Sequence, residues 1–375
     1  MKIRAAVLDR SQQPLPYAET RPISVETVDL DAPGPGEVLV KIAAAGLCHS
    51  DLSIINGERP RPLPIALGHE AAGIVEELGA GVTDLQRGDH VALVFMPNCG
   101  HCLPCQEGRP ALCEPGFAAA VAGTLLSGQR RLHRPDKSAI NHQVGVSCFA
   151  EYAVVAHGSL VKIDRDLPLD IAAVFGCAVL TGVGAAINCA QMKLGQSLAV
   201  VGLGGVGLSA LLGGLAAGAR QIVAIDKLDA KLAVARELGA THAFRADDPD
   251  LVAQVKAATG GGVDVAVEAA STVEALMTAY QITRRGGTTV TVSLPPPNAT
   301  LNVPAVNLVV EERTLKGSFL GSAVPARDIP RFIALYKAGR LPIDRLVTHR
   351  IKLDDINHGF DRLARGEAIR QVIVF

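Results

Sequence analysis

The stretch from Ser197 to Asp226 constrains the fold of this chain more than any other. An apolar run typical of a buried strand leads into the sequence GLGGVG at residues 202–207, and a helix-like segment follows. A second apolar run then ends at the acidic residue. This order of strand, glycine-rich turn, helix and strand is typical of a dinucleotide-binding βαβ unit. We therefore predict a parallel sheet with a dinucleotide site at its turn.

The glycines of this turn each have a physical reason. Gly202 permits the tight turn, Gly204 lets the backbone approach a pyrophosphate, and Gly207 lets helix and strand pack closely. The pyrophosphate would bind the N–H groups at the start of the following helix. Asp226 stands where a carboxylate accepts hydrogen bonds from an adenosine ribose and repels a 2′-phosphate. We therefore expect NAD rather than NADP.

Composition and charge narrow the class of protein. Residues 198–219 carry no charge and are long enough to span a bilayer, but glycine is frequent there and disfavours a lipid-exposed helix. A hydrophobic content of 49% with 38 glycines suits an α/β protein with buried parallel strands. With 36 basic and 37 acidic residues, the chain offers no footprint for nucleic acid or an anionic membrane. The N-terminus lacks the apolar core of a signal peptide, so we expect a cytoplasmic protein.

The most specific spacing in the chain is a run of four cysteines. Cys99, Cys102, Cys105 and Cys113 are separated by two, two and seven residues. Four thiolates close a tetrahedron around Zn²⁺ and leave no open position, which indicates a structural zinc site. The rival interpretation is an iron–sulfur cluster, but the proline that follows the fourth ligand in ferredoxin-type runs is missing.

A second set of metal-ligating residue types is spread along the chain. Cys48 and His69 lie in separate predicted loops, and Cys177 lies in a predicted buried helix pair. Two thiols and one imidazole with an open position form the ligand set of alcohol dehydrogenase zinc. Asp51 is a candidate acceptor for the second imidazole nitrogen, and Glu70 could act on the metal from the second shell. We take the remaining cysteines, at positions 148 and 189, as structural.

Together these motifs resemble the zinc-dependent medium-chain alcohol dehydrogenases, in the form that carries a structural zinc, over essentially the whole chain. The resemblance implies an α/β fold with a GroES-like, mostly antiparallel β catalytic domain and a doubly wound, parallel-sheet Rossmann domain. Both chain ends build the catalytic domain in this family. We therefore expect the catalytic domain with both zinc sites at 1–178, the NAD-binding domain at 179–320, and a return to the catalytic domain at 321–375.

The resemblance also implies roles for individual positions. Catalytic zinc would be held by Cys48, His69 and Cys177, and the hydroxyl of Ser50 would begin the proton relay. Phe95 would line the substrate pocket next to that hydroxyl. A longer set of residues would contact NAD: His49, Thr181, Gly202, Gly204, Gly205, Val206, Gly207, Asp226, Lys231, Val292, Gly317, Phe319 and Arg370.

Two departures from the family pattern bear on function. Ser53 stands where many members have the outer histidine of the relay. The sequence Gly116-Phe117-Ala118 occupies the place of the basic residue that glutathione-dependent formaldehyde dehydrogenases carry. The segment 114–147 reads as a long loop with a solvated basic patch, and its small side chains suggest room for medium-chain or aromatic alcohols.

We accordingly expect reversible oxidation of primary alcohols, with secondary and aromatic ones as further candidates, by an enzyme with two Zn²⁺ per subunit and NAD. The alternative is an S-(hydroxymethyl)glutathione dehydrogenase. A zinc-ribbon nucleic-acid binder conflicts with the neutral charge balance. A non-catalytic relative would have no use for a complete set of catalytic zinc ligands. We expect a homodimer that binds neither nucleic acid nor a membrane.

Overall fold

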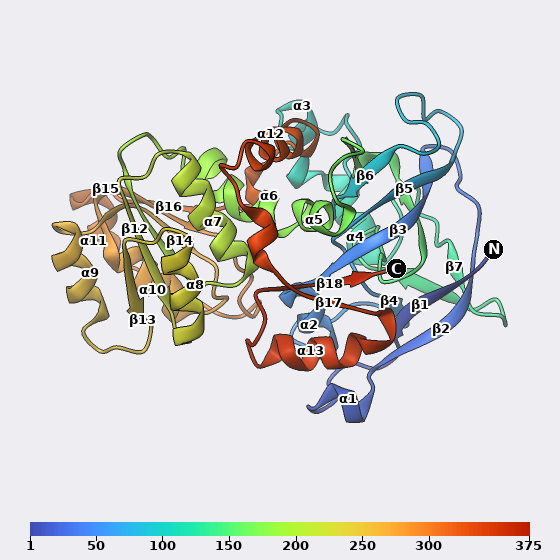
Figure 1. Cartoon of the computed structure of the whole chain (residues 1–375), viewed down its shortest axis with the longest axis horizontal. Coiled ribbons are helices and arrows are strands. Elements are labelled where there is room, and N and C mark those ends of the chain that lie inside the picture. The colour runs from blue at the N-terminus through green and yellow to red at the C-terminus, as the bar shows by residue number, and fades with distance from the viewer. The chain divides into compact units, whose positions relative to one another are not determined.

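The computed structural model describes residues 1–375 and divides into two compact units. Unit 1 consists of Met1–Cys177, Val324–Pro330 and Val347–Phe375, and unit 2 consists of Ala178–Ala323 and Arg331–Leu346. Both ends of the chain, blue and red in Figure 1, therefore belong to unit 1. Residues 331–346, which lie in the predicted C-terminal return, group with unit 2.

Unit 1 contains two mostly antiparallel sheets, as the resemblance predicted. Five strands close a barrel in the order β1 (Lys2–Leu8), β2 (Ile23–Leu30), β7 (Leu132–His133), β8 (Ala139–His142) and β4 (Ile65–Ala66). A seven-stranded sheet has the order β10 (Leu160–Ile163), β6 (His90–Leu93), β5 (Ala71–Leu78), β3 (Glu37–Leu47), β18 (Arg370–Val374) and β17 (Val347–Ile351), and β9 (Tyr152–Ala156) also pairs with β3. Only the β4–β8 and β17–β18 pairs run parallel.

The helices of unit 1 are short and lie between these strands. They are α1 (Tyr17–Thr20), α2 (His49–Ile55), α3 (Leu103–Gln106), α4 (Glu114–Ala122), α5 (Leu169–Ala172) and α13 (Ile356–Ala364). The 3₁₀ turns are Pro110–Leu112, His157–Ser159, Ala173–Gly176 and Leu353–Asp355. The boundary between the two units falls inside α12 (Pro325–Lys337).

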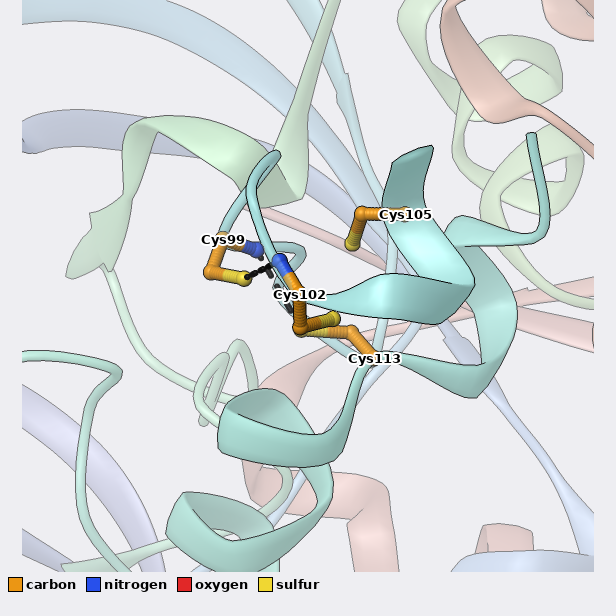
Figure 2. Close-up of side chains that lie close together, drawn as sticks. All are labelled: Cys99, Cys102, Cys105 and Cys113. Carbon is orange, nitrogen blue, oxygen red and sulfur yellow. Dashed lines mark hydrogen bonds between the residues drawn. The ribbon is translucent and has the colours of Figure 1, made fainter. Parts of the chain in front are cut away.

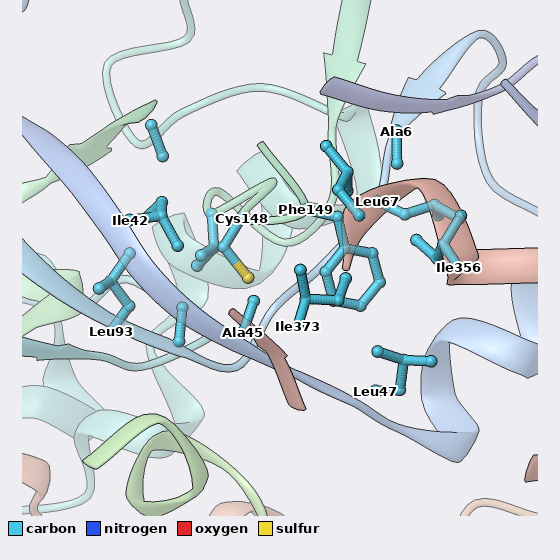
Figure 3. Packing of buried hydrophobic residues seen from close by; sticks show 14 of the residues in the cluster. Ala6, Ile42, Ala45, Leu47, Leu67, Leu93, Cys148, Phe149, Ile356 and Ile373 are labelled. Carbon is cyan, nitrogen blue, oxygen red and sulfur yellow. The ribbon is translucent and has the colours of Figure 1, made fainter. Parts of the chain in front are cut away.

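An apolar core in unit 1 holds the two chain segments that lead into the predicted zinc ligands. It gathers buried side chains from β3, β18 and α13 around Phe149, whose ring meets that of Phe360 edge to face at 6.2 Å between centroids. Leu47 and Leu67 belong to this core (Figure 3) and come just before the stretches that carry the predicted zinc ligands. Cys148 lies among the same side chains, and burial raises the pKa of its thiol well above the usual value.

The segment 114–147 is folded, so the prediction of a long loop there was wrong. It contains α4 and the barrel strands β7 and β8. The cysteine that precedes α4 accepts a hydrogen bond from the N–H group of Gly116, which caps the helix start. The sequence concealed these elements because β7 spans only two residues and the second half of α4 is mostly alanine, without a helical apolar period.

The basic patch in that segment also differs from the solvated face that we expected. Arg131 donates from Nε to the buried carboxylate of Glu37 at 2.9 Å. Arg134 donates to Asp9, just after β1, and to Glu26 on β2 at 2.8 and 3.0 Å. The arginines therefore bind this segment to both sheets of unit 1, since each reaches an acid that lies far from it in the sequence.

Unit 2 is a doubly wound parallel sheet, which confirms the predicted fold. Its strand order is β13 (His242–Arg245), β12 (Gln221–Asp226), β11 (Ser197–Val201), β14 (Val263–Glu268), β15 (Thr283–Thr291) and β16 (Thr314–Gly317), and every pairing is parallel. In chain order this is 3-2-1-4-5-6, the order of a dinucleotide-binding sheet. Strand β11 at the centre is buried throughout, as a strand covered on both faces requires.

Helices connect the strands of unit 2. They are α6 (Ala178–Gly184), which continues as a π-helix over Ala185–Cys189, then α7 (Gly205–Ala216), α8 (Asp229–Glu237), α9 (Leu251–Thr259), α10 (Val273–Ile282) and α11 (Ala305–Val310), with 3₁₀ turns at Phe319–Ser322 and Ile343–Leu346. No single helix of the chain has the length and apolar character to cross a membrane, although the bent pair Leu169–Gly176 and Ala178–Cys189 passes that test jointly.

Candidate metal centres and dinucleotide-binding turn

Four buried side chains converge in unit 1, and we call them the buried cluster: Cys48, His69, Glu70 and Cys177. Each offers one ligand atom, and these atoms all lie within 4.8 Å of one another. The sulfur of Cys177 is 3.5 Å from Nε2 of His69. The three predicted zinc ligands therefore meet at one point, together with a carboxylate.

Local structure explains how two of these residues reach that point. Cys48 follows β3 and precedes α2 with an extended backbone, and its N–H donates to Oδ2 of Asp51 at 2.9 Å. His69 follows Gly68, whose φ of +100° is strained for residues with a side chain. A Cβ at Gly68 would also lie 2.5 Å from the backbone nitrogen of Phe149. The tight packing of this turn therefore requires glycine.

A carboxylate sets the orientation of the His69 imidazole. Nδ1 of His69 lies 2.7 Å from Oδ1 of Asp51, and both side chains are buried. An ionised carboxylate can only accept, so in the neutral imidazole the proton is on Nδ1 and the lone pair for a ligand is on Nε2. Burial alone would lower the pKa of His69, but the charge of Asp51 raises it well above the usual value.

The carboxylate of Glu70 is the one buried group of this cluster that lacks hydrogen bonds. Neither of its oxygens has a hydrogen-bond partner, and Nη2 of Arg370 lies 3.4 Å from Oε2. Burial raises the pKa of Glu70 to about 7, although the charge of Arg370 acts in the opposite direction. Arg370 arrives through the antiparallel pairing of β18 with β3, and it donates to the carbonyl of Leu47 at 2.9 Å.

The donors of the buried cluster fit a zinc ion. Two thiols and one imidazole are the ligand types that Zn²⁺ prefers, and three protein ligands leave a fourth position open. A buried carboxylate without hydrogen bonds would gain from a nearby cation. The thiols of Cys48 and Cys177 interact so strongly that the pKa of Cys48 falls well below its usual value while that of Cys177 rises.

The second cluster is the four-cysteine loop, which comprises Cys99, Cys102, Cys105 and Cys113 (Figure 2). Its sulfurs lie within 4.8 Å of one another, and those of Cys102 and Cys113 are 3.9 Å apart. A tetrahedral zinc with bonds of about 2.3 Å places sulfurs about 3.8 Å apart, so this geometry fits the ion. No disulfide joins any of the four thiols.

Backbone N–H groups support the sulfurs of the four-cysteine loop. The N–H of Cys99 donates to the sulfur of Cys113 at 3.2 Å, and that of Cys102 donates to the sulfur of Cys99 at 3.3 Å. Burial raises the pKa of Cys102, but hydrogen bonds from backbone groups and neighbouring thiols bring it down to about 7. Burial raises the pKa of Cys105 to about 12. The loop therefore depends on its main chain for support.

The glycine-rich turn of unit 2 has the geometry that the sequence predicted. Gly202 has a φ of +92°, and a Cβ at Gly207 would lie 1.8 Å from the carbonyl oxygen of Gly202. A Cβ at Gly204 would meet no protein atom within 4 Å, so the protein leaves space in front of the backbone there. The carboxylate of Asp226 accepts the N–H of Leu203 at 2.7 Å and so ties the end of β12 to the turn.

The other predicted cofactor residues of unit 2 gather near the carboxyl ends of its strands. Val292 follows β15, and Gly317 ends β16 just before Phe319. The remaining ones lie on helices and at the turn: Thr181, Gly205, Val206 and Lys231. In unit 1, His49 is the exposed first residue of α2 and Arg370 is buried. Carboxyl ends of parallel strands are the usual edge for a dinucleotide.

The predicted relay and pocket residues lie close to the buried cluster in unit 1. Ser50 is half-buried in the first turn of α2. The ring of Phe95 meets the imidazole of His69 at a centroid distance of 5.4 Å and an interplanar angle of 89°. Ser53, at the position where relatives often have histidine, donates to the carbonyl of His49 at 3.1 Å.

Two buried polar residues at these sites have no counterpart in our sequence predictions. Gln143 donates to Asp51 at 2.7 Å, 92 positions away in the chain. Glu268 ends β14 and accepts hydrogen bonds from Ser271, Thr291 and Ser293, which ties together the loops after β14 and β15. A polar residue that interrupts an apolar run, as in VDVAVEAAS, is the signal that could have indicated the second of them.

Comparison with known proteins agrees with this arrangement. The model of the family described as "Alcohol dehydrogenase GroES-like domain" matches residues 34–165, and that of the family "Zinc-binding dehydrogenase" matches residues 205–338. The solved structure of benzyl alcohol dehydrogenase from Acinetobacter calcoaceticus superposes with a TM-score of 0.93 at 33% identity, over 100% of this chain and 99% of that one.

Two relatives that are named for other activities also align over nearly the whole chain. The NDMA-dependent alcohol dehydrogenase of Amycolatopsis methanolica is 38% identical over 100% of this chain and 99% of its own length. The geraniol dehydrogenase of Castellaniella defragrans is 41% identical over 94% of this chain and 95% of its own.

Proposed function

Because the chain belongs to the family of zinc-binding alcohol dehydrogenases, we propose that it oxidises alcohols reversibly to aldehydes or ketones with transfer of a hydride to NAD. The observation that carries this proposal is the buried cluster: two thiols, an oriented imidazole and a carboxylate without hydrogen bonds lie within reach of one ion. The same chain carries a glycine turn with space for a pyrophosphate.

Cys48, His69 and Cys177 would hold the catalytic zinc, and Glu70 would lie beside it. The ion would lower the pKa of a bound alcohol so that its alkoxide exists near neutral pH. The short distance from Cys177 to Nε2 of His69 supports this ligand set. The hydrogen bond from His69 to Asp51 supports the same assignment, because in the neutral ring it places the proton on Nδ1 and leaves Nε2 as the ligand atom.

Ser50 would accept the proton of the alcohol and pass it outward. Its place in the first turn of α2, two residues after Cys48, supports this role, as does its half-buried side chain. Ser53 cannot act as the outer base that a histidine provides, and its hydroxyl already donates to a main-chain carbonyl. We therefore propose that the proton leaves through water or the cofactor ribose.

The four-cysteine loop would hold a structural zinc, because four thiolates leave no position for a substrate. We propose NAD as the dinucleotide on the strength of Asp226, a carboxylate at the end of β12 that would repel a 2′-phosphate. The contacts to it would come from the residues that the family resemblance assigns. Because one relative is NDMA-dependent, the electron acceptor of this protein must be tested directly.

For the substrate, we propose primary alcohols whose hydroxyl-bearing carbon adjoins a double bond or an aromatic ring. Two of the relatives are named for geraniol and benzyl alcohol, which share that feature. The Phe95 ring beside His69 supports the proposal, since an aromatic side chain can pack against a flat, unsaturated substrate. Formaldehyde bound to glutathione is the second candidate.

We also propose a homodimer formed through unit 2. Strand β16 is an edge strand whose residues are all exposed. The neighbouring helix α11 exposes Val306, Val309 and Val310. An unpaired edge beside exposed apolar side chains is typical of an interface rather than of a free surface. A mass of two chains in light scattering is the expected result.

The activity test measures NADH absorbance with zinc-loaded protein. Benzyl alcohol and geraniol should be oxidised faster than ethanol or a secondary alcohol, and NAD should serve better than NADP. Parallel reactions contain formaldehyde with glutathione, or NDMA. Turnover only with the glutathione adduct would replace the proposed substrate. Turnover only with NDMA would mean that NDMA, and not NAD, is the final acceptor of the electrons from the alcohol.

A further inference from the structure

The side-chain amide of Gln143 joins two parts of the buried cluster. Gln143 follows β8 directly and is 3% exposed. Its Oε1 accepts the N–H of Gly68 at 2.6 Å, and its Nε2 donates to Oδ1 of Asp51 at 2.7 Å. Gly68 immediately precedes His69, while Asp51 is the carboxylate that holds the His69 ring. One side chain thus contacts the backbone before the imidazole and the partner of the imidazole.

Chemistry allows only one orientation of this amide. The N–H of Gly68 can only donate, so it must face the oxygen of Gln143, and an ionised Asp51 can only accept, so it must face the nitrogen. A flipped amide would place two donors together and two acceptors together. The two partners therefore fix the orientation of the amide.

The main chain of Gln143 is held as firmly as its side chain. Its N–H donates to the hydroxyl of Ser147 at 2.9 Å, and that hydroxyl donates to the carbonyl of Ala66 at 2.7 Å. Both Ser147 and Gln143 are buried. The backbone of Gln143 is therefore fixed at the end of β8, and its side chain extends from there to Asp51 on α2.

Asp51 collects three hydrogen bonds, and each has a different origin. Oδ1 accepts from the His69 ring and from Gln143, while Oδ2 accepts from the N–H of Cys48. The carboxylate plane is thereby fixed from both sides. Without the bond from Gln143, Oδ1 would keep only the bond to the His69 ring, and the bond from Cys48 to Oδ2 would be the one other restraint on rotation of the carboxylate.

We propose that Gln143 is a positioning residue for the catalytic metal: it holds Asp51 and Gly68 so that Nε2 of His69 points at the ion. This inference rests on the proposed function, because it assigns the same buried cluster to zinc. Groups that orient a ligating imidazole through its second nitrogen typically change metal affinity 10–100-fold when they are replaced. The amide of Gln143 acts one hydrogen bond further out.

The test compares Gln143→Met with Asn141→Leu as a matched control. Asn141 lies two residues earlier, is also buried, and bonds to the carbonyl of Pro64 and to Arg130 rather than to Asp51. Zinc affinity is measured by competition with a chromogenic chelator, without substrate or NAD. Gln143→Met should weaken one of the two zinc sites by about 10-fold or more and leave the other unchanged, whereas Asn141→Leu should leave both affinities unchanged.

Gln143→Glu provides a second variant in case Gln143→Met does not fold. Its carboxylate keeps an acceptor for Gly68, but when ionised it has no donor for Asp51 and repels that carboxylate, so it should weaken the same zinc at least as much. Wild-type zinc affinity in both variants would overturn the positioning role. A wild-type protein that binds two zinc ions but oxidises no alcohol would count against the proposed function alone, because the affinity contrast does not depend on turnover.

Discussion

The buried cluster and the four-cysteine loop are both suited to zinc, yet they are built in opposite ways. The loop takes its ligands from 15 consecutive residues, 99–113, and three of its four cysteines are partly exposed. The buried cluster takes its donors from three stretches that lie far apart in the chain, and all of them are buried. A local, all-sulfur site can close around an ion on its own, whereas the mixed site depends on the whole fold of unit 1.

Support differs in the same way. Backbone N–H groups donate to the sulfurs of the loop, so its geometry depends little on neighbouring side chains. Side chains support the buried cluster: Asp51 on the imidazole, Gln143 on Asp51, and Arg370 beside Glu70. The loop therefore suits a structural role. The buried cluster suits chemistry, since its carboxylate and open position can respond to a ligand.

The largest expected effect comes from the buried cluster. In Cys177→Ser a hydroxyl replaces a proposed thiolate ligand, so we expect kcat/KM for benzyl alcohol to fall at least ~10³-fold, because a catalytic zinc would contribute several kcal/mol to the transition state. The melting temperature should change little, since the volume of the side chain is nearly conserved. Steady-state kinetics and calorimetry on the same preparation measure both. Turnover near the wild-type rate would remove Cys177 from the ligand set.

The four-cysteine loop should give the converse result. Cys102→Ser is expected to release the zinc that we propose for this loop and to lower the free energy of unfolding by several kcal/mol, because metal binding stabilises such loops. The kcat/KM per folded molecule should stay within about 3-fold, since this loop contributes no ligand to the buried cluster. Denaturant unfolding and active-site titration test this. A variant of wild-type stability that has lost turnover would reverse the roles of the two sites.

The contrast between the sites also explains what the sequence could predict. All four ligands of the loop fall within one spacing pattern, and the glycine turn of unit 2 is likewise local, so both could be read directly. The Cys48–His69–Cys177 set needed a family resemblance, because its members are ligands only once the chain is folded. Gln143 could not be predicted, since its partner Asp51 lies 92 positions away and an amide has no spacing signature.

Strand pairing and short elements limited the prediction in unit 1. Arg370 reaches Glu70 only because β18 pairs with β3, a contact between distant parts of the chain that no local pattern encodes. The segment 114–147 was misread for a related reason. Its two short strands are stabilised by the barrel that they complete and by ion pairs with distant acids, rather than by their own propensities.

Two buried imidazoles in unit 1 also differ in their surroundings, one at the buried cluster and one away from it. His69 has a carboxylate at its Nδ1, whereas His142 accepts the N–H of Arg131 at Nε2 and has no partner at Nδ1. Burial, aided by the charges of nearby arginines and His133, lowers the pKa of His142 to about 3. Of these two buried imidazoles, only His69 has an acid at Nδ1 and an Nε2 beside a possible metal ligand.

The smallest predicted effect follows from this neutral histidine. Below the unfolded-state pKa of about 6.5, His142 binds a proton in the unfolded chain but stays neutral in the native protein. The free energy of unfolding therefore falls as the pH drops from about 6.5 towards 3. Between pH 8 and pH 5 this contribution is about 2 kcal/mol. In His142→Gln the side-chain oxygen can still accept the N–H of Arg131 but does not titrate. The loss of stability between those pH values should therefore be smaller by about that amount in denaturant unfolding. Replacing the exposed His358 by Gln should leave the loss unchanged, and an equal loss in His142→Gln and the wild type would mean that His142 is protonated in the native protein.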